Sequence, residues 1–150
     1  MSIGGYRQRT RSRRLVRCCW SNGHVRPTGG RTEETFRNEE EAAFFNCIDC
    51  APGDRVGLGV SDPVDGKFRI IRTTDGGASW EVLPDAGMPD SSDEVNFSAS
   101  GDCLSMTGHD AWFGVGGEDA RVHHSDDRGL TTRPPHARLR AVGGVLGCWW

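Results

Sequence analysis

The sequence predicts an all-β protein in which a unit of four short strands occurs twice. Three observations lead to this prediction. Short apolar or alternating segments are separated by turn residues, and Gly accounts for 21 of the 150 residues. One turn motif recurs, with its aspartates at positions 75 and 127, and a repeat of roughly 50 residues is typical of stacked four-stranded units.

The first predicted unit lies between residues 42 and 83. Its second segment alternates cleanly, so that every other side chain faces one side of a strand. The residues Asp62–Gly66 have the composition of a turn. The four expected strands are Ala42–Ile48, Arg55–Ser61, Lys67–Arg72 and Trp80–Leu83.

The second predicted unit repeats this order with different residues. Each segment is again short and rich in apolar or β-branched residues, and polar residues separate the segments. The four expected strands are Asn96–Ser100, Cys103–Met106, Ala111–Val115 and Ala120–His124.

A turn motif with a clear physical rationale follows the third expected strand of the first unit and the fourth expected strand of the second unit. The aspartate can accept hydrogen bonds from the backbone that follows it, the glycine permits a positive φ, and the hydroxyl groups can close the turn. A large aromatic ring can then be buried under the hairpin. We therefore predict a structural role for these residues, which are Thr73, Asp75, Gly77, Ser79 and Trp80 in the first copy and Ser125, Asp127, Gly129 and Thr131 in the second. In the second copy Thr132 replaces the tryptophan.

The pattern Ser/Thr-x-Asp-x-Gly-x-Ser/Thr-Trp resembles the Asp-box, or BNR repeat, of sialidase-like β-propellers. Residues 33–132 also resemble bacterial photosystem II assembly or stability factor-like proteins with BNR repeats, some of which are labelled oxidoreductase or glycosyl hydrolase. The segments that carry this resemblance are Thr35–Cys47, Ser61–Ile70, Ala111–Gly114 and Ala120–Val122. It implies a partial β-propeller of about two four-stranded blades, in which the motif aspartates are fold elements away from any catalytic face.

Charge divides the chain into three regions. All 21 acidic residues lie between Glu33 and Asp127, whereas residues 1–32 and 133–150 contain arginines and no acids. We expect a disordered Arg-rich leader at 1–32, propeller blades at 33–132 and a disordered tail at 133–150. The acidic middle argues against a nucleic-acid partner. The abrupt loss of pattern at both ends suggests a truncated or frame-disrupted fragment of a longer propeller.

Cysteine usage and hydropathy give expectations about the compartment. The six cysteines form no regularly spaced framework, which favours reduced thiols. No apolar stretch is long enough to span a membrane, and no intact export signal is visible, so the location stays unknown, with the cytoplasm as default. Cys47 and Cys50 form a C-x-x-C without a second pair, so no metal is expected there.

An enzymatic alternative rests on one short segment. Phe68–Ile71 resembles the Phe-Arg-Ile-Pro motif of sialidases, although it lacks the proline, and that family's nucleophile is a tyrosine, whereas Tyr6 in the leader is the sole tyrosine of this chain. The glycines at 114–117 lack the context of a dinucleotide fingerprint, so no cofactor is expected. His123 and His124 are expected to be solvated, and Asp62 and Asp65 to cap a turn rather than bind calcium.

These observations favour a non-catalytic scaffold that binds another protein, with no small-molecule ligand, cofactor or metal. Two alternatives remain open at this point. One is a fragment of a sialidase-like glycoside hydrolase, and the other is a gene remnant without function.

Overall fold

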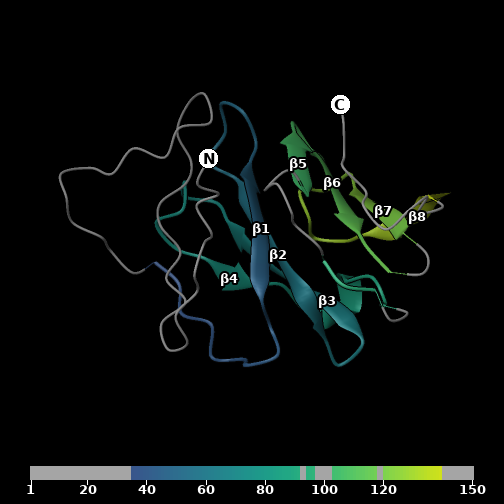
Figure 1. Ribbon diagram of the computed structural model, residues 1–150. Helices are drawn as coiled ribbons and strands as arrows, with labels where there is room; N and C mark the ends of the chain where they lie inside the picture. Colours follow the sequence, from purple (N-terminus) through teal and green to yellow (C-terminus); the bar gives the residue numbers. More distant parts are fainter. Residues whose placement is uncertain (1–34, 92–93, 97–102, 118–119, 140–150) are drawn as a thin grey trace, which may run out of the picture.

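A computed structural model describes residues 35–91, 94–96, 103–117 and 120–139 (Figure 1). The chain is all-β over these residues, with one short 3₁₀ helix, η1 (Asp85–Gly87). The expected leader at 1–32 lies outside them. The strands are β1 (Phe45–Cys50), β2 (Gly57–Val64), β3 (Lys67–Thr73), β4 (Glu81–Val82), β5 (Leu104–Thr107), β6 (Asp110–Val115), β7 (Ala120–Ser125) and β8 (Arg133–Leu139).

The strands form two antiparallel sheets in simple up-and-down order, β1-β2-β3-β4 and β5-β6-β7-β8. This confirms the prediction of an all-β fold with two four-stranded units, and the unclosed pair of sheets has the form of a partial propeller. The sheets lie side by side, with β1 near β5 (Figure 1). A hydrogen bond of 2.8 Å from the backbone N–H of Met106 to Asp49 Oδ2 joins these two strands.

The β2–β3 hairpin illustrates how local sequence shapes the first sheet. Val64 and Lys67 are register partners, so Asp65 and Gly66 form a two-residue turn with φ of 51° and 78°. A positive φ at both positions matches the twist of the flanking strands, and Asp-Gly suits it. The register shifts between Val60 and Pro63, so β2 continues past the expected end at Ser61 through an irregularity.

The main core lies between the two sheets, and aromatic rings from both sheets meet there. Phe68 of β3 and Phe113 of β6 make an edge contact with ring centroids 5.6 Å apart. His123 of β7 stacks on Phe113 at 4.8 Å and lies 5.5 Å from Phe68. Phe68 is completely buried, and large apolar side chains of this kind contribute about 1.5–3 kcal/mol each on burial.

A second apolar cluster lies on the opposite face of the first sheet. Trp80 and Ile71 belong to it, together with Ala43 and Phe45. Gly59 lets Ile71 approach, because a Cβ at this glycine would lie 2.8 Å from Ile71 Cγ1. Trp80 therefore packs away from the second sheet, under the hairpin that it follows.

The outer strand of the second sheet differs from the prediction. The expected first strand was Asn96–Ser100. Asn96 lies outside any strand, and residues 97–100 lie outside the described residues. The fourth strand is instead β8, which pairs with β7 and begins where the unstructured tail was predicted. The tail prediction was wrong for 133–139, and 140–150 lie outside the described residues.

Two prolines, Pro134 and Pro135, lie within β8, and the strand pairing shows how the sheet accommodates them. His124 pairs with Arg133 and Val122 with Ala137, so both prolines fall in the interruption between the two pairs. Strand β8 is also at the edge of its sheet, where a residue without an N–H is tolerated.

Contact between the sheets can be tested at Gly129, which has a φ of +85°. A Cβ at this position would lie 2.6 Å from the Leu58 side chain of the first sheet. Gly129→Ala should lower the free energy of unfolding by about 1–3 kcal/mol more than the matched change Gly53→Ala. Gly53 has a similar φ of +75° but open space around it. Equal losses in denaturant unfolding would show that Leu58 and Gly129 are not in tight contact.

Candidate functional site

The predicted motif residues of the first copy lie in the turn between β3 and β4, called here the first turn (residues 73–80). Asp75 Oδ1 accepts hydrogen bonds from the Thr73 hydroxyl at 2.8 Å and from the Ser79 backbone N–H at 2.9 Å. Asp75 Oδ2 accepts one from the Ser79 hydroxyl at 2.7 Å. The Thr73 hydroxyl oxygen also accepts from the Gly77 N–H at 2.9 Å. Both carboxylate oxygens are thus used to close the turn.

The second turn (residues 125–132), between β7 and β8, contains the same hydrogen bonds. Asp127 Oδ1 accepts from the Ser125 hydroxyl at 2.8 Å and from the Thr131 N–H at 2.9 Å. Asp127 Oδ2 accepts from the Thr131 hydroxyl at 2.6 Å, and Ser125 Oγ accepts from the Gly129 N–H at 2.8 Å. Two stretches of different sequence therefore adopt one local geometry.

Each turn is also bonded to the first hairpin of its own sheet. The N–H of Gly76 donates to the Arg55 carbonyl at 2.8 Å, and the N–H of Arg128 donates to the His109 carbonyl at 2.9 Å. Gly76 has a φ of 77° and Arg128 a φ of 62°, so the second turn holds a non-glycine residue in the left-handed region. The Arg128 guanidinium is 3.0 Å from Asp54 Oδ2, in the loop between β1 and β2 of the first sheet.

Hydrogen bonding determines the electrostatics of both carboxylates. The Ser79 hydroxyl, followed by the Ser79 N–H and the Thr73 hydroxyl, lowers the pKa of Asp75 well below its usual range. Partial burial raises the pKa of Asp127, but hydrogen bonds from Thr131 and Ser125 outweigh it and the net shift is downward. Both carboxylates are therefore ionised acceptors at neutral pH, which suits a structural lock and not a general acid.

The two turns differ at their eighth position. Trp80 is buried in the cluster on the far face of the first sheet. Thr132, in the corresponding place, donates its N–H to the Gly87 carbonyl at 3.0 Å and so ties the second turn to η1 of the first unit. Sequence reasoning did not find this contact, because no motif marks η1 as a partner.

The segment Glu94–Asn96 connects the two sheets. Glu94 is buried, with Oε1 2.6 Å from Nε of Arg121 in β7. Val95 pairs with Gly116 through two backbone hydrogen bonds of 2.9 Å. Asn96 turns toward the first sheet, where its N–H donates to Asp62 Oδ1 at 3.0 Å. Burial raises the pKa of Asp62, and this hydrogen bond opposes the shift.

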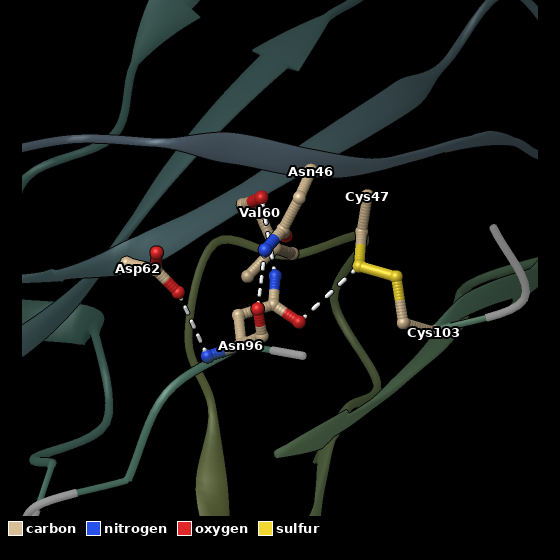
Figure 2. Close-up of a disulfide and its surroundings, with 6 residues drawn as sticks. All are labelled: Asn46, Cys47, Val60, Asp62, Asn96 and Cys103. Atoms are coloured by element: carbon tan, nitrogen blue, oxygen red, sulfur yellow. Dashed lines mark hydrogen bonds between the residues drawn. A yellow bond between two sulfur atoms is a disulfide. The ribbon is translucent and has the colours of Figure 1, made fainter. Parts of the chain in front are cut away.

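A disulfide between Cys47 and Cys103 joins the sheets beside Asn96 (Figure 2). The expectation of reduced thiols was therefore wrong for this pair. Sequence spacing could not reveal it, because the two cysteines are 56 residues apart and meet only when the sheets pack, with a Cα–Cα distance of 5.9 Å. In the part of the chain that the structure describes, no group of three or more His, Cys, Asp or Glu side chains could hold a metal ion.

The two histidines face opposite sides of β7, and the expectation that both are solvated was wrong for His123. His124 lies on the outer face, where Nε2 is 2.8 Å from Asp110 Oδ1 and the ring stacks on Trp112. His123 is 1% exposed, and neither ring nitrogen has a hydrogen-bond partner among the described residues. Burial lowers the pKa of His123 from 6.5 to about 4, and the charge of Arg121 adds to the shift.

Other candidates from the sequence take structural positions. Arg69 is half-buried on β3, and Tyr6 lies outside the described residues. Asp65 forms the β2–β3 turn.

No family model, curated protein or solved structure matches this chain. Within the described residues, no helix has the length and apolar character needed to cross a membrane.

The turn carboxylates can be tested by amide substitution. Asp75→Asn and Asp127→Asn should each lower the melting temperature at pH 7, because an amide cannot accept at both ends as the carboxylate does. A lowered pKa means that this stabilisation is present above pH 3.8, the ordinary value, and is lost as the pH falls through the folded-state pKa. The difference in melting temperature between each variant and the wild type should therefore become smaller at acidic pH. Asp85→Asn, an exposed aspartate in η1, is the control and should melt like wild type.

The buried histidine predicts a separate acid sensitivity. The pKa of His123 is lower in the folded state, so stability is complete above pH 6.5 and falls as the pH drops from 6.5 to about 4. The total loss should be roughly 3 kcal/mol. His123→Phe should flatten this part of a stability-versus-pH curve, whereas His124→Gln on the outer face should keep it. A wild-type curve that is flat between pH 6.5 and 4 would contradict this prediction.

Proposed function

We propose that the chain is a non-catalytic scaffold of the Asp-box β-propeller type, similar to assembly factor-like proteins, and that it acts by binding another protein. The observation that carries this proposal is the complete use of both motif carboxylates inside their turns. Asp75 accepts three hydrogen bonds from Thr73 and Ser79, and Asp127 accepts the equivalent three from Ser125 and Thr131. Such carboxylates support an architecture and are not available to a substrate.

The position of the turns supports the propeller type. Each lies between the third and fourth strands of a four-stranded sheet, and each is bonded to the first hairpin of the same sheet. The same side-chain lock at the same place in consecutive sheets is a property of repeat architectures, in which each unit is covered by its neighbours.

The outer face of the second sheet supports protein binding. Ser105, Trp112 and His124 are register neighbours on this face, opposite the core. The Trp112 ring stacks on His124 with centroids 5.0 Å apart, and Asp110 holds the imidazole. A rigid aromatic side chain with polar groups around it is the kind of anchor that protein interfaces use.

A photo-crosslinking residue at Ser105 tests this face in cells that express the full chain. We expect a defined protein adduct, identified by mass spectrometry, that is lost when Trp112→Asp is added and retained when Leu130→Asp is added. Leu130 is exposed in the second turn, away from this face, which makes it the matched control. The same adducts from Ser105 and from Glu81, on the edge of the first sheet, would argue against a specific face.

A further inference from the structure

The disulfide lies at a buried point between the sheets. Cys47 belongs to β1 and is 1% exposed, and Cys103 precedes β5 and is 8% exposed. A hydrogen bond between Asp49 and the N–H of Met106 joins the same two segments independently of sulfur. Opening the S–S bond therefore leaves another polar link between the sheets in place.

Asn96 lies against one of the two sulfur atoms. Its Oδ1 is 3.2 Å from Cys47 Sγ (Figure 2). A sulfur in a disulfide carries no hydrogen, so it cannot donate to this oxygen. A Cys47 thiol carries the required hydrogen at a distance suited to a hydrogen bond from sulfur. Asn96 Oδ1 is thus an acceptor that gains a hydrogen-bond donor only when the disulfide is reduced.

The orientation of Asn96 does not depend on the disulfide. Its backbone N–H donates to Asp62, its Nδ2 donates to the Val60 carbonyl at 3.2 Å, and its own carbonyl accepts from Asn46 Nδ2 (Figure 2). Rotating the amide by 180° would bring its oxygen against the Val60 carbonyl, so the arrangement with Oδ1 toward sulfur is the stable one. The side chain is 2% exposed, which shields this contact from water.

We propose that Cys47 and Cys103 form a reversible redox clasp, and that Asn96 is a built-in acceptor for the reduced state. A small thiol such as glutathione attacks the sulfur of Cys103, which is the more exposed of the two residues, and the Cys47 thiolate leaves and takes up a proton. A second glutathione attacks the glutathione sulfur of this mixed disulfide and releases the Cys103 thiol. In total, two glutathione molecules give two electrons and two protons to the protein disulfide, which becomes two thiols, and the two glutathiones become one glutathione disulfide. The Cys47 thiol then donates to Asn96, and the sheets stay packed without the covalent link.

The test uses the full chain with Cys18, Cys19, Cys50 and Cys148 replaced by serine, so that one pair remains. The protein is equilibrated in glutathione buffers, and alkylation with mass spectrometry gives the fraction reduced. We expect reversible interconversion and a cooperative melt for both forms, with the reduced form melting lower. A reduced form that shows no cooperative melt would overturn the proposal.

The Asn96→Ala variant distinguishes a role of Asn96 as acceptor for the Cys47 thiol from a role that stabilises both redox forms equally. Loss of the acceptor should destabilise the dithiol form more than the disulfide form, and so shift the equilibrium constant about two- to tenfold toward the disulfide. Asn46→Ala, which removes a hydrogen bond common to both forms, should leave the constant unchanged. An unchanged constant in Asn96→Ala would also overturn the proposal.

A second comparison remains valid if Asn96→Ala does not fold. Cys47→Ser with Cys103→Ala places a hydroxyl donor beside Asn96, and Cys47→Ala with Cys103→Ala places none. The serine protein should melt higher in the same four-serine background. Equal or lower melting would show that the oxygen of Asn96 does not accept from residue 47.

Discussion

This structure depends on hydrogen bonds from backbone N–H groups to a carboxylate that replaces a missing strand partner. Between β3 and β4, and again between β7 and β8, the backbone leaves the sheet and its N–H groups lose their ladder acceptors. Asp75 and Asp127 supply acceptors at a fixed place in the turn, helped by a hydroxyl on each side. Each rigid turn lets the outer strand, β4 or β8, return to its sheet.

The two sheets then need each other, because one face of each is apolar. Phe68, Phe113 and His123 fill the space between them, and Gly129 lets the second turn approach Leu58. The polar groups in this interface include the ion pair of Glu94 with Arg121 and the His123 imidazole, whose ionisation is suppressed by burial. A fall in pH and reduction of the disulfide are therefore both expected to weaken the interface between the two sheets.

Much of the architecture could be predicted from local sequence pattern, and the predictions that were wrong share a cause. The alternation in β2 and the Asp-Gly turn depend on neighbouring residues, so they were visible in the sequence. Strand β8 was missed because Pro134 and Pro135 oppose a regular strand, and its stability comes from β7. His123 was expected in solvent because periodicity shows alternation between faces but not which face is covered.

The sequence by itself determined the all-β class, the four strands of the first unit and the residues that could lock the turns, because these features follow from spacings of a few residues. Only the tertiary structure decided that Cys47 meets Cys103, that Asn96 lies beside them and that the second turn packs on the first sheet. These contacts join residues far apart along the chain, and their geometry exists only after two separately patterned sheets have buried their apolar faces together.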